Sequence, residues 1–139
     1  MFPPRSSSAS SATISCRAMA SLLVFTKPHQ WHSSIAEVRF NSVLLNLYRD
    51  GKDGISWHTD AESELGNNPV IGSASFGGAR RFMFKHKHNK DLKAEVELTH
   101  GSFLLMAGTT QHFWQHQIPK TSKKVNPRIN LTFRVIGHS

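Results

Sequence analysis

Two residues with metal-binding side chains stand close together in His58-Thr59-Asp60. In an extended segment, residues two apart project to the same side, so this imidazole and this carboxylate can share one ion. A second imidazole, His116, follows far downstream near the end of another expected strand. The three side chains would form a two-histidine, one-carboxylate triad, which leaves positions open on Fe(II). Taken alone, the His-x-Asp pattern carries little weight, because the chain has 9 His and a surface His beside an Asp is usually a solvated pair.

A second pattern lies near the C-terminus, where polar side chains occupy every second position of an apolar segment: Arg128, Asn130, Thr132 and Arg134. A period of two places them on one face of a strand. That face can be the solvated side of a half-buried antiparallel strand. It can also bind a small dicarboxylate, because guanidinium groups bind carboxylates in bidentate fashion. Asn46 and Tyr48 repeat the pattern on one face of an earlier expected strand.

The elements that must position these residues are short apolar or alternating runs separated by turn residues. This pattern is typical of an all-β sandwich or barrel. We therefore expect an all-β core with minor α structure, in a double-stranded β-helix (jelly roll) of about eight strands. The expected strands are 43–48, 55–58, 70–76, 81–85, 94–98, 103–106, 113–118 and 129–136, with one short helix over 32–39.

Length and composition limit the class of protein. The 139 residues suit one domain, and 38% hydrophobic residues are enough to form a core. No stretch approaches the ~20 apolar residues of a membrane helix, so we expect no membrane partner, and we expect a monomer. The single cysteine, Cys16, excludes an internal disulfide. The formal net charge of +8 favours polyanionic partners such as nucleic acid.

The N-terminal stretch 1–36 differs from the rest of the chain. It has no acidic residue, and six of the ten positions from 6 to 15 are serine. Such composition is typical of an organellar transit peptide, and it equally suits a disordered leader or a start of translation at Met19. We therefore expect residues 1–36 to be a leader and residues 37–139 to form the domain.

Taken in order, four motifs resemble the AlkB family of Fe(II)- and 2-oxoglutarate-dependent dioxygenases: Asn46-Leu47-Tyr48, His58-x-Asp60, His116 and Arg128-x-Asn130-x-Thr132-x-Arg134. The flanking segments 40–44, 75–77, 100–102 and 127–134 are similar to the nuclear DNA-repair members of that family. The resemblance runs from about residue 40 to 136.

The resemblance implies a role for each motif residue. His58, Asp60 and His116 would be the iron ligands. Arg134 and Asn46 would hold the end of 2-oxoglutarate nearer the metal, Arg128 and Tyr48 would hold its distal carboxylate, and Asn130 and Thr132 would support that pocket. Glu62 would lie close to the target base. Ala61 departs from the pattern, since several relatives that act on duplex DNA have an acidic residue there.

The activity implied by the resemblance is oxidative demethylation of 1-methyladenine or 3-methylcytosine in DNA, with Fe(II), 2-oxoglutarate and O₂. Methylated RNA or a protein side chain remains an alternative substrate. A further alternative is that the chain is a jelly-roll binding module without catalytic activity. Two basic groups would contact phosphates or be solvated surface: Arg80, Arg81 and Lys85 with Lys87, Lys90 and Lys93, and then Lys120, Lys123 and Lys124. The resemblance favours the nucleus, whereas the serine-rich stretch favours a chloroplast or mitochondrion.

Overall fold

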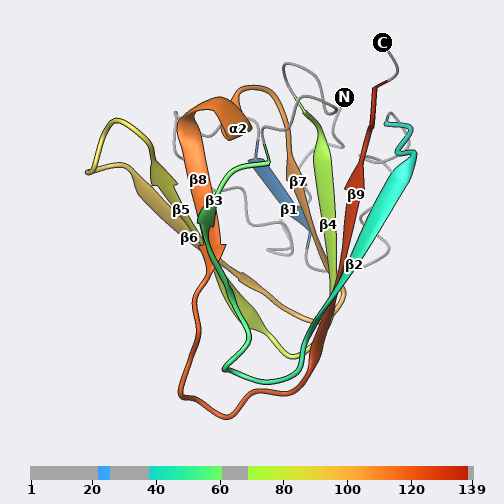
Figure 1. Cartoon of the computed structure of the whole chain (residues 1–139), viewed down its shortest axis with the longest axis vertical. Coiled ribbons are helices and arrows are strands. Elements are labelled where there is room, and N and C mark those ends of the chain that lie inside the picture. The colour runs from blue at the N-terminus through green and yellow to red at the C-terminus, as the bar shows by residue number, and fades with distance from the viewer. Residues whose placement is uncertain (1–21, 26–37, 61–68, 138–139) are drawn as a thin grey trace, which may run out of the picture.

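The computed structural model describes residues 22–25, 38–60 and 69–137, and strands dominate this part of the chain (Figure 1). All of the strand pairs are antiparallel. The elements are β1 (Leu22–Phe25), β2 (Ser42–Tyr48), β3 (Ile55–His58), β4 (Ile71–Gly77), β5 (Arg80–His86), β6 (Lys93–Leu98), β7 (Ser102–Met106), α2 (Thr110–Phe113), β8 (Trp114–Ile118) and β9 (Arg128–Arg134).

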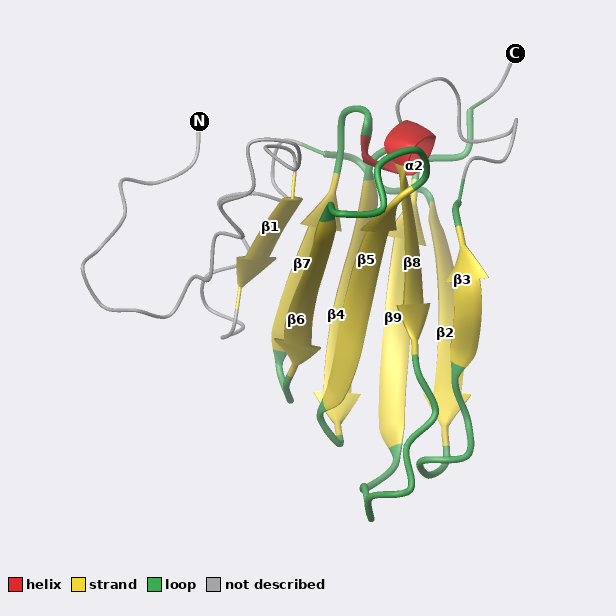
Figure 2. Ribbon diagram, turned by 90° about the vertical axis from the view of Figure 1, so that its left-hand side faces the viewer, coloured by secondary structure: helices red, strands yellow, loops and turns green. Residues whose placement is uncertain are grey.

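The strands form two sheets that face each other. One sheet has the order β1-β7-β4-β9-β2, and the other has the order β3-β8-β5-β6. Figure 1 shows the sheets far apart at the end where α2 lies and converging at the end where the β8–β9 loop lies, and Figure 2 looks onto their broad faces, with one sheet in front of the other. This arrangement confirms the predicted jelly roll.

The eight predicted strands are all present, with ends that differ by no more than two residues from the expected ones. Phe113 was expected to begin a strand, but it is the last residue of the helix α2, and β8 begins at the next residue. The helix expected over 32–39 falls largely outside the described residues. In the part of the chain that is described, no helix is long and apolar enough to cross a bilayer.

Strand β1 corrects the expected domain boundary. It lies within the stretch 1–36, yet it pairs with β7 in the register Leu22↔Met106 to Phe25↔Phe103. Residues 22–25 therefore belong to the larger sheet. A run of four apolar residues is long enough to form a strand. It is too short to change the average composition of the stretch, so serine content and charge do not reveal it.

Alternation along the strands sorts side chains between the two faces of the larger sheet. On β9 the polar residues point to the space between the sheets, while Ile129, Leu131 and Phe133 point outward. The polar alternation at the C-terminus is thus an interior face and not a solvated one. The apolar core between the sheets consists of Tyr48, Ile71, Phe82, Phe84, Leu98, Leu104, Met106, Trp114 and Ile118.

A glycine turn sets the point where β9 begins. Gly77 has a φ of 92°, and a Cβ there would lie 2.2 Å from the carbonyl oxygen of Pro127. Gly77 pairs with Arg128 in the β4–β9 register, and the amide of Gly78 donates to the same carbonyl at 2.9 Å. Glycine is required because positive φ is unfavourable for residues with a side chain.

We therefore expect Gly77→Ala to lower the free energy of unfolding by at least about 1–2 kcal/mol, the usual cost of positive φ. Urea unfolding followed by tryptophan fluorescence measures this loss. Gly137→Ala is the control, because Gly137 is exposed and lacks positive φ, and it should change stability by less than about 0.5 kcal/mol. Equal stability of the two variants would contradict the strained turn.

Candidate metal centre

Strand register brings the two candidate histidine ligands together. His58 ends β3 and lies directly opposite His116 in the β3–β8 ladder, after a register shift between Ile55 and His58. Their rings meet edge to face with centroids 4.2 Å apart. Two imidazoles that are distant in the sequence thus become neighbours because adjacent antiparallel strands carry them.

Each imidazole is oriented by its surroundings. The Nδ1 atom of His58 lies 2.8 Å from the carbonyl oxygen of Ser56, and because a carbonyl only accepts, Nδ1 carries the proton. Nε2 of His58 is therefore left as the electron-pair donor, as in many metal sites. His116 is 3% exposed and stacks on Phe82 with centroids 5.1 Å apart.

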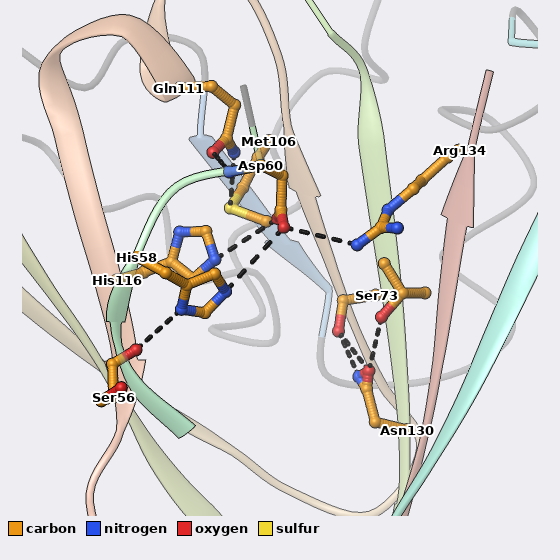
Figure 3. Close-up of polar contacts among 10 residues, drawn as sticks. Ser56, His58, Asp60, Ser73, Met106, Gln111, His116, Asn130 and Arg134 are labelled. Atoms are coloured by element: carbon orange, nitrogen blue, oxygen red, sulfur yellow. Dashed lines mark hydrogen bonds and ion pairs between the residues drawn. The ribbon is translucent and has the colours of Figure 1, made fainter. Parts of the chain in front are cut away.

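Asp60 completes the cluster from the loop that follows β3. Its carboxylate oxygens lie 3.4 Å from Nε2 of His116 and 3.8 Å from Nε2 of His58 (Figure 3). A third contact comes from the other sheet, where Nη2 of Arg134 lies 3.3 Å from Oδ1 of Asp60. One ligand atom from each of His58, Asp60 and His116 lies within 4.8 Å of the others.

The environment favours the protonation states that a metal needs. Burial alone would raise the pKa of the Asp60 carboxyl, but the hydrogen bond and charge of His116 and the charges of Arg134 and His58 outweigh it and lower that pKa. Burial lowers the pKa of His116, although Asp60 partly opposes this shift. An ionised carboxylate beside a neutral imidazole is the donor state for metal binding.

The cluster lies on the wall of a cavity of about 290 Å³ between the sheets. The cavity size is near the lower end of ligand pockets, about 300–1,000 Å³. Apolar side chains line part of it, and the polar lining residues are Asn46, Tyr48, His58, Asp60, Ser73, His116, Asn130, Thr132 and Arg134.

A short polar chain holds the wall opposite the histidines. The Ser73 and Asn130 side chains are within hydrogen-bonding distance through both amide atoms, at 3.0 Å and 2.7 Å. The Thr132 hydroxyl donates to the Asn130 amide oxygen at 3.2 Å. Asn46 faces Asn130 across the β2–β9 ladder, and both residues line the cavity.

Arg128 is fully buried at 0% exposure and lies on the same inward face of β9 as Asn130. Its Nη2 donates to the Ser75 hydroxyl at 2.9 Å, and its guanidinium carbon is 5.0 Å from the centroid of the Tyr48 ring. The Nε and Nη1 atoms have no hydrogen-bond partner among the described residues. Burial lowers the pKa of Arg128, although the charge and hydrogen bond of Tyr48 partly oppose this shift.

These residues fit an Fe(II) ion and a dicarboxylate. Two imidazole nitrogens and one carboxylate oxygen are the donor set of a two-histidine, one-carboxylate iron site. A carboxylate would satisfy the buried donors that have no partner within the described part of the chain, which are Nε and Nη1 of Arg128 and Nε of Arg134. The metal would be held by His58, Asp60 and His116, next to Arg134.

The predicted basic groups occupy very different positions. Arg80 is 4% exposed, and its guanidinium donates to the backbone carbonyls of Asp50, Asp53 and Pro119 at 3.2, 2.8 and 2.8 Å. It therefore anchors two loops and does not fit the expected role as a phosphate contact. The alternation of β5 explains this, because Arg80 shares the inward face with Phe82 and Phe84.

Arg81 and Lys85 lie on the opposite, outer face of β5. Arg81 forms an ion pair with Glu95 of β6. The ammonium of Lys85 lies 4.4 Å from the centroid of the Trp57 ring. Both charges are thus already engaged within the four-stranded sheet.

The exposed lysines are divided between the two ends of the sandwich. Lys87 and Lys90 lie in the β5–β6 hairpin, which contacts α2 through a bond from the Lys87 amide to the Phe113 carbonyl. The β8–β9 loop, which carries Lys120, Lys123 and Lys124, lies at the end opposite α2 (Figure 1). Glu62 falls outside the described residues.

The sequence interpretation missed several residues of the site. Gln111, on α2, is 1% exposed and its Oε1 accepts the Asp60 amide at 2.8 Å. Ser73 and Ser75 on β4 support Asn130 and Arg128. The alternating Ser73-x-Ser75 pattern inside an apolar strand was a usable signal, whereas nothing in the local sequence marks Gln111.

Comparison with known proteins assigns the class. The chain belongs to the 2OG-Fe(II) oxygenase superfamily, whose family model matches residues 6–134. Within that superfamily it is of the AlkB type. It is 46% identical over 105 residues to the mouse "Alpha-ketoglutarate-dependent dioxygenase alkB homolog 3", which covers 70% of this chain and 37% of that protein.

Other relatives agree with this assignment. The human alkB homolog 3 is 40% identical over 127 residues, covering 78% of this chain and 44% of that protein. The human "DNA oxidative demethylase ALKBH2" is 40% identical over 111 residues, covering 75% of this chain and 42% of that protein. The chain therefore spans less than half the length of these relatives.

A solved structure supports the fold. The structure of OsALKBH1 superposes with a TM-score of 0.56 at 23% sequence identity, over 70% of this chain and 49% of that one. At this level of identity the likeness concerns the fold alone, and it agrees with the jelly roll described above.

Removing the buried charge of Arg128 should separate stability from cosubstrate binding. Arg128→Met should leave the apoprotein at least as stable as the wild type, since replacing a buried ion with an apolar chain is often neutral or stabilising. It should weaken 2-oxoglutarate binding at least about tenfold, because hydrogen bonds to charged groups contribute about 1.5–3 kcal/mol. Thermal unfolding and calorimetric titration with Mn(II) present measure the two effects.

Arg39→Met is the matched control, because Arg39 is exposed and lies outside the site. Arg39→Met should change neither the stability of the apoprotein nor its affinity for 2-oxoglutarate. An Arg128→Met variant with wild-type affinity for 2-oxoglutarate would contradict the role of this guanidinium.

Proposed function

We propose that this chain catalyses Fe(II)- and 2-oxoglutarate-dependent oxidative demethylation of N-methylated nucleic-acid bases, with 1-methyladenine and 3-methylcytosine in DNA as the substrates. The observation that carries the proposal is the convergence of His58, Asp60 and His116 on one cavity wall, opposite the polar wall of β2 and β9. The printed name of the ALKBH2 relatives, "DNA oxidative demethylase", supports DNA as the substrate class.

The chain's own residues would bind and orient the reactants. His58, Asp60 and His116 would hold the metal, which together with 2-oxoglutarate and O₂ would supply the oxidising chemistry. Asn46 and Arg134 face the cavity and would orient the near end of the dicarboxylate. Oxidation of an N-methyl group releases formaldehyde and restores the base, so no protein nucleophile is required.

The substrate base must leave the nucleic-acid stack to reach the metal. This costs a few kcal/mol and is easiest for a damaged or unpaired base. Among the apolar residues that line the cavity, Leu44 and Ile55 are exposed and offer a surface on which a planar base can pack.

The decisive experiment is incubation with oligonucleotides that carry 1-methyladenine or 3-methylcytosine. We expect formaldehyde and succinate in equal amounts, dependent on Fe(II). Loss of an outer-shell partner already costs about 10–100-fold, so His116→Ala, which removes a ligand, should reduce turnover at least about 100-fold. His88→Ala is the control, since His88 is exposed on the hairpin. Succinate without loss of the methyl group would exclude these bases as substrates.

The β5–β6 hairpin is the proposed phosphate-binding element, because it carries exposed lysines and adjoins α2 at the end of the sandwich where Asp60 lies. Lys90→Glu with Lys93→Glu should weaken DNA binding, and this pair leaves the hydrogen bond from the Lys87 ammonium to the Gln111 carbonyl in place. The slope of log affinity against log salt should fall by about 0.7–0.9 for each phosphate that the variant no longer neutralises.

Lys123→Glu with Lys124→Glu carries the same change of charge in the β8–β9 loop. We expect this variant to bind DNA more tightly than the hairpin variant. Fluorescence anisotropy at several salt concentrations compares them, and weaker binding by the loop variant would assign the phosphate-binding element to the β8–β9 loop instead.

A further inference from the structure

Asp60 lies beyond the last pair of residues in its sheet. The β3–β8 ladder ends at His58↔His116, so the ladder does not hold the backbone of Asp60. The Asp60 amide instead donates to the Oε1 atom of Gln111 at 2.8 Å, and both residues are buried (Figure 3). A side chain from 51 positions away therefore supplies the support that a strand neighbour would normally give.

The orientation of the Gln111 amide is determined by its two contacts. A backbone amide only donates, so the oxygen of Gln111 must face Asp60. The nitrogen then faces the Met106 sulfur at 3.6 Å, which is a weak acceptor. With Gln111 at 1% exposure and Met106 at 2%, water does not replace either contact.

Gln111 also links the segments that carry two of the three candidate ligands. It lies on α2, which runs directly into β8, the strand of His116. The bond to Asp60 therefore ties the loop after β3 to the segment before His116, on the side where the ladder has ended. The ladder fixes His58 relative to His116, and Gln111 fixes Asp60 relative to His116.

We propose that Gln111 is a positioning residue of the metal centre, which sets the placement of the Asp60 carboxylate relative to His116 by accepting the Asp60 amide. Without this acceptor, a buried N–H would lose its partner and the loop would shift to satisfy it. Metal affinity is sensitive to such displacement because the donor atoms must converge on one point. The inference rests on the metal centre of the proposed function, but not on the identity of the methylated substrate.

The test is anaerobic titration of the apoprotein with Co(II), followed by its visible absorption. Gln111→Met keeps the length of the side chain and removes the oxygen acceptor. We expect its affinity for Co(II) to fall about 10–100-fold, as for other residues that support ligands, and the absorption bands to change in shape and intensity. The band shape reports coordination, which a purely structural role for Gln111 would leave unchanged.

Two further variants isolate the acceptor. Met106→Leu removes only the other partner of the Gln111 amide, so it should bind Co(II) as the wild type does. Gln111→Asn shortens the side chain by one methylene and so moves the oxygen away from the Asp60 amide. If Gln111→Met fails to fold, Gln111→Asn should show the same loss of Co(II) affinity.

Wild-type affinity and spectrum in both Gln111→Met and Gln111→Asn would overturn the proposal, as would equally weakened binding in Met106→Leu. Failure of the wild type itself to bind Co(II) would overturn the metal centre on which the inference rests, and the two failures are thereby distinguished. Thermal unfolding of each apoprotein accompanies the titrations, and a loss of affinity that matched the loss of stability in every variant would also overturn the proposal.

Discussion

The Asp60 carboxylate is the group that both sheets of this sandwich reach. His58 and His116 approach it from the four-stranded sheet, and Arg134 approaches it from the five-stranded sheet. A buried carboxylate is costly unless other groups compensate its charge. The separation of the sheets at the α2 end, the register of β3 with β8 and the inward face of β9 therefore have one common result, which is to surround this carboxylate with partners.

Arg80 and Arg128 show how the same side chain serves two different purposes in one fold. Both are buried, and both guanidiniums lie near the Tyr48 ring, with their central carbons 5.8 and 5.0 Å from its centroid. Arg80 has three backbone carbonyls as acceptors and locks the loops at the narrow end. Arg128 has Ser75 as its acceptor, and among the described residues two of its nitrogens have none. The two guanidiniums therefore differ in the number of hydrogen-bond partners that they have, and not in burial or charge.

The architecture and the candidate metal ligands could be predicted from the sequence because they depend on local periodicity and short motifs. Alternation of period two indicated the strands, and it correctly placed Arg128, Asn130, Thr132 and Arg134 on one face. The alternation did not say which face was interior, and a solvated face remained open until the sheets were paired. The likeness to the AlkB family then indicated three candidate ligands by motif, and the structure brings these three side chains together.

The errors concern residues whose role depends on contacts between distant segments. Arg80 was grouped with its basic neighbours, although alternation along β5 turns it inward. Gln111 was missed because its partner is 51 positions away. The four-residue β1 was missed because composition dominated the interpretation of its surroundings, whereas its identity depends on pairing with β7. Tertiary contacts decided each of these cases.

The direct opposition of His58 and His116 also bears on how the chain folds. In a β-ladder, a shift of one residue turns every side chain of a strand to the other face. A slip of β3 against β8 would therefore send one imidazole outside the sandwich and leave its partner inside. An ion that requires both imidazoles binds the native pairing and not the slipped one, so it stabilises the correctly assembled chain by mass action. The ion would in this way favour the native strand register over slipped ones, in addition to its part in the reaction.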